Sequence, residues 1–149
     1  MQVQIGRKTD IDDWMKLVEE ISWNFPGLEA KEKINGHRET VLRFINKEQA
    51  LCAKDDTGKI VGVLLFSRGH NMICCLGVLP THRRYGIASS LLSMALEQLD
   101  RTKDVSVSTF REEDEKGIAP RALYKKFGFV EDELIEEFGY PNQVFLLHP

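Results

Sequence analysis

The chain has 149 residues, of which 42% are hydrophobic and 29% are charged, proportions typical of an ordinary globular protein. This length fits one domain of common size, so we expect a single domain over residues 1–149. The net charge is −3 and the basic residues are dispersed, which argues against a nucleic-acid-binding protein.

The first third of the chain predicts one strand followed by two helices. Residues 2–7 alternate between polar and apolar side chains, as a strand does. Thr9 and Asp10 precede a helical pattern and either suits an N-cap, so a helix is expected to run to about Trp23. The sequence NFPG at residues 24–27 ends this helix, and a second amphipathic helix is expected over residues 29–46.

Strands follow in the middle of the chain. Residues 51–54 and 60–67 are apolar runs joined by the turn sequence DDTGK, which predicts a β-hairpin. Residues 71–79 form a third apolar run that is nearly continuous. Such a run is typical of a strand in the middle of a sheet, buried on both faces.

The remaining elements alternate helix and strand. They are expected to be a helix over residues 87–100, a strand over 105–109, a helix over 119–127 with Gly128 at its C-cap, and strands over 129–137 and 143–147 joined through 139–141. The whole pattern predicts a mixed α/β fold.

Neither a membrane segment nor a disulfide framework is predicted. The apolar runs are too short to span a bilayer, and the first ten residues resemble no signal peptide. We therefore expect a cytoplasmic protein with no membrane partner. Three cysteines, two of them adjacent as Cys74 and Cys75, fit no zinc-ligand spacing and indicate buried thiols.

The sequence PTHRRYGIASSLL, beginning at Pro80, joins a predicted strand to a predicted helix. The first N–H groups of a helix lack partners within it and lie at the positive end of its dipole, so they can bind an anion. Gly86 and Ala88 are small enough for close approach, and Arg83 and Arg84 add positive charge. This junction therefore predicts an anion site.

The expected cap position, Tyr85, is not a capping residue type, which leaves these amides for a bound phosphate. The fingerprint R-x-x-G-x-A differs from the dinucleotide-binding and P-loop motifs. Taken alone it is also compatible with a solvated turn or with generic nucleotide binding.

Two segments together resemble the GNAT superfamily of N-acetyltransferases. Residues 76–88 resemble its acetyl-coenzyme A (acetyl-CoA) motif, a strand followed by [RQ]-x-x-G-x-[GA]. About forty residues later, ALYKKFGF at residues 122–129 resembles its second motif. The resemblance implies a mostly antiparallel central sheet flanked by helices, with acetyl-CoA as co-substrate.

The resemblance also implies site residues. The cofactor would be held by Leu76, Gly77, Val78, Arg83, Arg84, Tyr85, Gly86, Ile87, Ala88 and Ser89, with pyrophosphate on the loop amides and pantetheine along the strand. Tyr124 aligns with the general acid that protonates the departing thiolate. Gly77 suits a bulge or a close backbone approach.

The sequence departs from the family pattern in two places. Residues 116–121 lack an asparagine that many members have, and residues 71–75 contain no carboxylate to serve as general base. The candidates for that base are Glu112, Glu113, His70 or a chain of waters, with Glu112 preferred. The acidic segment around Glu112 would also attract a cationic amine.

These features predict an N-acetyltransferase that transfers an acetyl group from acetyl-CoA to a primary amine by direct attack. The acceptor, a small molecule or a protein amine, is not predicted. Transfer through Cys75 and a non-catalytic CoA sensor on the same fold are the alternatives.

Exposed strand edges near the C-terminus favour a homodimer. The residues expected either to line the acceptor pocket or to pack in the core are Trp23, Phe25, Phe110 and Tyr140.

Overall fold

The computed structural model describes residues 1–22, 31–83 and 85–149. Its helices and strands follow the predicted order. They are β1 (Gln2–Ile5), α1 (Ile11–Ile21), α2 (Lys31–Asn46), β2 (Ala50–Lys54), β3 (Ile60–Ser67), β4 (Met72–Val78), α3 (Ile87–Gln98), β5 (Val105–Phe110), α4 (Ile118–Lys126), β6 (Val130–Glu137) and β7 (Tyr140–Leu147). The fold is therefore mixed α/β, as predicted.

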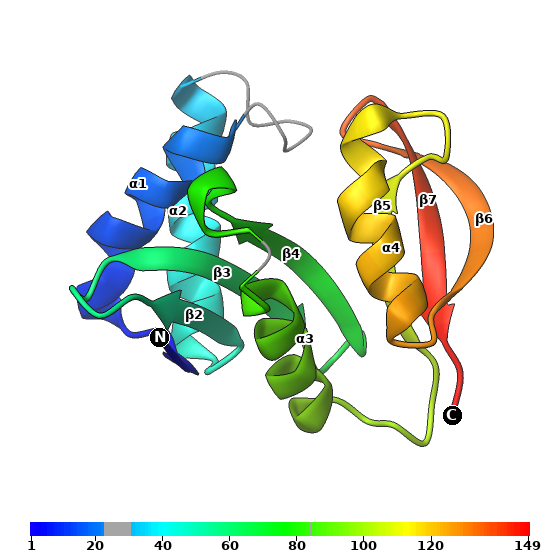
Figure 1. Ribbon diagram of the computed structural model, residues 1–149, viewed down its shortest axis with the longest axis horizontal. Helices are drawn as coiled ribbons and strands as arrows, with labels where there is room; N and C mark the ends of the chain where they lie inside the picture. The colour runs from blue at the N-terminus through cyan, green and yellow to red at the C-terminus, as the bar shows by residue number, and fades with distance from the viewer. Residues whose placement is uncertain (23–30, 84) are drawn as a thin grey trace.

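The strands form one seven-stranded sheet in the order β1-β2-β3-β4-β5-β7-β6 (Figure 1). Neighbouring strands are antiparallel except for β4 and β5, which are parallel. β4 is the middle strand, which confirms the interpretation of its apolar run. β7 lies between β5 and β6, so the final hairpin extends the sheet beyond β5.

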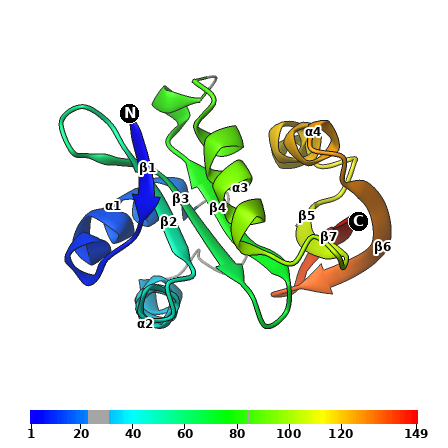
Figure 2. The ribbon, with the colours of Figure 1, turned by 90° about the horizontal axis from the view of Figure 1, so that it is seen from below.

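Helices cover both faces of the sheet (Figure 2): α1 and α2 lie on one face, and α3 lies on the other. Trp14 and Leu17 of α1 are buried in the core. Helix α3 packs closely on β3, because a Cβ added at Gly62 would lie 2.7 Å from Ile87 Cγ2 and 3.0 Å from Leu91 Cδ1. This contact fixes the first turn of α3 against the sheet.

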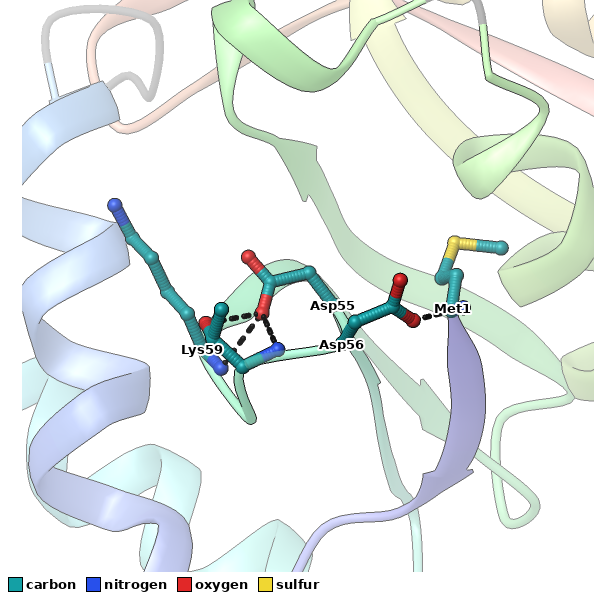
Figure 3. Close-up of polar contacts among 5 residues, drawn as sticks. Met1, Asp55, Asp56 and Lys59 are labelled. Atoms are coloured by element: carbon teal, nitrogen blue, oxygen red, sulfur yellow. Dashed lines mark hydrogen bonds and ion pairs between the residues drawn. The ribbon is translucent and has the colours of Figure 1, made fainter.

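The turn between β2 and β3 is organised by Asp55 (Figure 3). Its Oδ1 accepts hydrogen bonds from the backbone N–H groups of Thr57 and Lys59, at 2.9 and 3.0 Å, and from the Thr57 hydroxyl at 2.6 Å. The neighbouring Asp56 carboxylate lies 3.3 Å from the Met1 amino group. The predicted hairpin is confirmed.

Two predicted boundaries near the functional region are wrong. The N-cap of α3 is Gly86, with φ +75°, and not Tyr85, because glycine adopts this left-handed conformation without steric cost. The segment 139–141 was expected to join the last two strands, but β7 already begins at Tyr140. The turn consists of Phe138 and Gly139, which leaves Glu137 paired with Tyr140 at the end of the hairpin.

Candidate active site

Strands β4 and β5 diverge beyond their short paired segment (Figure 1). The residues on either side of this divergence line a cleft. These parallel strands pair only through Met72 with Ser106 and Ile73 with Val107. Among the described strands, none pairs with residues 74–78 of β4 on this side. The cleft has a volume of about 1050 Å³ and is lined by β4, β5, α4, the start of α3 and the end of β6. It is large enough for a drug-sized ligand.

A β-bulge interrupts β4 at the point where the cleft begins. Leu65 of β3 pairs with Cys75, whereas the next residue, Phe66, pairs with Ile73. Cys74 is therefore the extra residue. Of the two roles expected for Gly77, a bulge or a close backbone approach, the bulge is therefore excluded, and the close approach stays a prediction.

The backbone groups of β4 beyond the bulge alternate between β3 and the cleft. The Leu79 N–H group donates to the Val61 carbonyl at 2.9 Å, so the backbone groups of Gly77, two residues earlier, also point toward β3. Leu76 and Val78 consequently present their N–H and C=O groups to the cleft. Leu76 and Val78 are two of the three β4 residues expected to hold the cofactor. Their backbone groups can form hydrogen bonds with an extended ligand, as those of a neighbouring strand would.

The N-terminus of α3 faces the cleft with unpaired amide groups. The first helical hydrogen bond is from Ser90 N–H to the Gly86 carbonyl, at 3.0 Å. The amides of Ile87, Ala88 and Ser89 therefore have no partner within the helix, and no side chain among the described residues caps them. All three residues and Gly86 line the cleft. These free amides lie at the junction where the sequence predicts an anion site.

Of the two arginines expected to add positive charge at this site, the structure describes one. Arg83 and His82 line the cleft beside the α3 amides. Arg84 lies outside the described residues. Tyr85 is 73% exposed and is not among the residues that line the cleft, so the structure does not bring it to the predicted site.

Tyr124 of α4 projects from the core into the same cleft. It is only 4% exposed, its ring packs 5.6 Å from that of Phe129, and it lines the cleft. Its hydroxyl makes no hydrogen bond to a described residue. Burial, with a smaller contribution from the Cys75 thiol, raises the pKa of Tyr124 above its ordinary value. The hydroxyl therefore stays protonated at neutral pH and can donate a proton.

The two adjacent cysteines of β4 share the cleft with Glu137, a carboxylate that the sequence analysis missed. Although part of each residue's surface is accessible, the protein atoms around the two thiols displace water from them and so raise their pKa values. The pKa of Cys74 rises to about 11, assisted by the charge of Glu137, and the pKa of Cys75 rises to about 12, assisted by Cys74. Tyr124, Cys74, Cys75 and Glu137 all line the cleft, so one proton donor and one carboxylate face the same space. Cys74 is exposed and Cys75 half-buried, which corrects the expectation that both are buried.

These high pKa values count against transfer through Cys75. The nucleophile in such a mechanism is the thiolate, and a thiol with a pKa near 12 is almost entirely protonated at neutral pH. Direct attack by the acceptor on the thioester needs no such species.

Glu137 is held by the β6–β7 hairpin. The Asn142 Nδ2 group donates to Glu137 Oε1 at 3.3 Å, and Asn142 is itself 4% exposed. Arg111 Nε donates to the Asn142 carbonyl at 3.1 Å, which fixes this part of β7. The carboxylate is therefore supported by a buried amide.

The predicted bases lie elsewhere. Glu112, Glu113 and His70 are exposed and are not among the residues that line the cleft. Glu115 and Glu137 line it instead. The sequence shows Glu137 only as the last residue of an acidic strand, and no local pattern indicates that this strand ends beside β4.

The aromatic residues proposed for the acceptor pocket separate into three groups. Phe110 lines the cleft. Tyr140 is not among the lining residues: its hydroxyl donates to Asp114 Oδ2 at 2.6 Å, and its ring packs edge-on against Phe110 at 5.7 Å. Trp23 and Phe25 lie outside the described residues.

Comparison with solved structures supports the same fold. A GNAT-family acetyltransferase from Bacillus cereus ATCC 10987 is 23% identical, with a TM-score of 0.74 over 97% of this chain and 94% of that one. An N-acetyltransferase from Staphylococcus aureus Mu50 is 18% identical, with a TM-score of 0.76 over 98% and 100%. The PaiA N-acetyltransferase from Thermoplasma acidophilum, in complex with coenzyme A, is 16% identical, with a TM-score of 0.71 over 99% and 98%.

Comparison of the sequence with protein families identifies the chain more directly. A search of curated proteins found no match. The family model described as "Acetyltransferase (GNAT) domain" matches residues 46–131, which is more than half of the chain and includes β4, the start of α3 and Tyr124. The chain therefore belongs to the GNAT acetyltransferase family.

Proposed function

We propose that this protein transfers an acetyl group from acetyl-CoA to a primary amine by direct attack. The observation that carries the proposal is the cleft at the divergence of β4 and β5, which is lined by the uncapped N-terminus of α3 and by Tyr124 and Glu137. The complex of the PaiA relative with coenzyme A supports the choice of donor.

Each part of the donor matches a different part of the cleft. The amides of Ile87, Ala88 and Ser89 would bind pyrophosphate, and Arg83 would add charge-assisted contacts. We extend this role to Arg84. The backbone groups of Leu76 and Val78 would bond the pantetheine arm and polarise the thioester carbonyl, as oxyanion donors do.

The amine must lose a proton before it attacks. An alkylamine with a pKa of about 10.4 requires roughly 4–5 kcal/mol to become neutral at pH 7. We assign proton removal to Glu137, directly or through a water molecule, in preference to Glu112, since Glu137 lines the cleft and Glu112 does not. The nitrogen then forms a bond to the carbonyl carbon and the carbon–sulfur bond breaks.

Tyr124 would complete the reaction by protonating the departing thiolate. Its raised pKa keeps the proton available throughout the neutral range. The hydroxyl has no partner among the described residues that it would have to give up. Loss of such a general acid costs about 100- to 10,000-fold in rate.

The test is a thiol-release assay with acetyl-CoA and a broad panel of primary amines, comparing the wild type with Tyr124→Phe. We expect kcat to fall by about 100- to 10,000-fold while the dissociation constant for CoA stays within twofold, since only the hydroxyl is removed. Tyr85→Phe is the matched control, because Tyr85 is exposed and does not line the cleft. Unchanged turnover by Tyr124→Phe would refute the assignment of the acid.

The same assay separates the alternative functions. CoA binding without turnover of any amine would support the non-catalytic sensor, and calorimetric binding of ATP or NAD would support a generic nucleotide site.

Among the described residues, no helix is both long enough and apolar enough to cross a membrane. The cytoplasmic location and the homodimer expected from the sequence stay predictions.

A further inference from the structure

The turn between β6 and β7 contains a bulky residue in an unfavourable backbone conformation. Phe138 and Gly139 both have positive φ, +55° and +72°, and Glu137 pairs with Tyr140 across them. Two-residue hairpin turns with positive φ at both positions favour Asn, Asp or Gly at the first position. Gly139 satisfies its position without strain, but Phe138 does not.

Phe138 is unfavourable in a second respect. Its side chain is 76% exposed, so the ring gains little from packing inside the protein. It nevertheless lines the cleft, directly next to Glu137. Strained residues that persist without a packing benefit are often found where a ligand is contacted.

The neighbouring carboxylate is held by a hydrogen bond, whereas the ring of Phe138 is exposed. Glu137 accepts a hydrogen bond from the buried Asn142 side chain at 3.3 Å. The next residue along the turn therefore offers an apolar surface at a constant place relative to a negative charge. A ligand that matches both would carry an ammonium group attached to an apolar body.

From this juxtaposition we infer that Glu137 and Phe138 form the acceptor site for a primary amine borne on an alkyl or aryl group. This inference rests on the proposed function and names its substrate class. The ring of Phe138 covers the apolar body, and Glu137 receives the ammonium. Polyhydroxylated amines of equal size have less apolar surface to place against the ring and are poorer acceptors.

The size of the effect follows from the hydrophobic contribution of each methylene. Burial of one CH₂ group corresponds to roughly a fourfold gain in kcat/KM. A series of primary n-alkylamines from ethylamine to hexylamine should therefore show kcat/KM rising by about fourfold for each carbon that reaches the ring. Phenethylamine should resemble the longer members.

The experiment measures this series with the wild type, Phe138→Asn and Phe138→Tyr. Asparagine tolerates positive φ, so Phe138→Asn should keep or raise the melting temperature while the gain per methylene falls to less than twofold. Ethylamine should be affected least. Phe138→Tyr keeps the ring and should keep the gain, which separates loss of the contact from a general structural defect.

Two failures are distinguishable. If the wild type and a folded Phe138→Asn show the same gain in kcat/KM per methylene, the assignment of the acceptor site to Phe138 is wrong, while the proposed acetyltransferase activity stands. If no primary amine is acetylated by the wild type although CoA binds, the proposed function fails and this inference fails with it. Should Phe138→Asn not fold, Phe138→Gly replaces it, because glycine accepts the same φ.

Discussion

A carboxylate at the start of α3 should weaken CoA binding while stabilising the free protein. In Ser89→Asp the new side chain lies in the first helical turn, where an acidic residue stabilises a helix by about 0.3–1 kcal/mol. Ser89 also lines the cleft beside the amides assigned to the pyrophosphate. The same charge should therefore have effects of opposite sign on stability and on ligand affinity.

The expected loss of affinity follows from Coulomb's law. Two unit charges about 4 Å apart repel by roughly 1 kcal/mol in water and by about 4 kcal/mol at an effective dielectric constant of about 20. The cleft is partly open, so the dissociation constant for CoA should rise between about fivefold and several hundredfold. The loss should shrink at high ionic strength, because salt screens exposed charges.

The assay is calorimetric titration with CoA and with pantetheine, which lacks the pyrophosphate. Ser90→Asp is the control, since Ser90 is the next residue of the same turn but does not line the cleft. Pantetheine binding should not change in either variant. Equal CoA affinity of Ser89→Asp and Ser90→Asp would refute the assignment of the anion site to these amides.

Two further predictions concern the scaffold. Gly62→Ala should lower the free energy of unfolding, measured by urea denaturation, by about 1–3 kcal/mol, because the new methyl group would lie 2.7 Å from Ile87 Cγ2. Gly69→Ala is the control. A methyl group there would have only one side-chain atom within 4 Å, so the free energy of unfolding should change little. Asp10→Asn should lower it by about 1–3 kcal/mol at pH 7, because Asp10 accepts a hydrogen bond of 2.7 Å from Lys54 Nζ. Burial alone would raise the pKa of Asp10, but the hydrogen bonds from Lys54 and the Arg7 amide lower this pKa overall. The stabilisation from the ionised carboxylate is therefore present above pH 3.8, the ordinary pKa, and is lost as the pH falls through the lower pKa of the folded state. A stability difference between Asp10→Asn and the wild type that persists undiminished at pH 2 would contradict this reasoning.

Local patterns were sufficient to predict two of the elements that line the cleft. The change from strand to helix around Gly86, and the helix that carries Tyr124, each depend on neighbouring residues in the chain. The Asp55 turn could be predicted for the same reason, since its hydrogen bonds reach no further than Lys59. In each of these cases, the residues that determine the local structure lie within a few positions of the structure that they determine.

The carboxylate at the cleft could not be predicted in this way. Glu112 was preferred as the base, but β7 lies beside β5, and the β6–β7 hairpin brings Glu137 to the cleft. The pairing of Phe110 with Asn142 brings the β6–β7 hairpin to this position. Which strands become neighbours depends on long-range packing, and alternation within a strand does not reveal it.

The bulge at Cys74 explains why the cleft exists at all. The Asn71 carbonyl accepts a hydrogen bond from Ser106 N–H at 3.2 Å, so by alternation the backbone groups of Ile73 also face β5. In a regular strand those of Cys75 would do the same and could continue the pairing. The extra residue turns Cys75 toward β3 and increases the local twist, so the pairing with β5 ends after Ile73. One inserted residue therefore separates the two strands and also determines that Leu76 and Val78, two of the β4 residues expected to hold the cofactor, face the space between them.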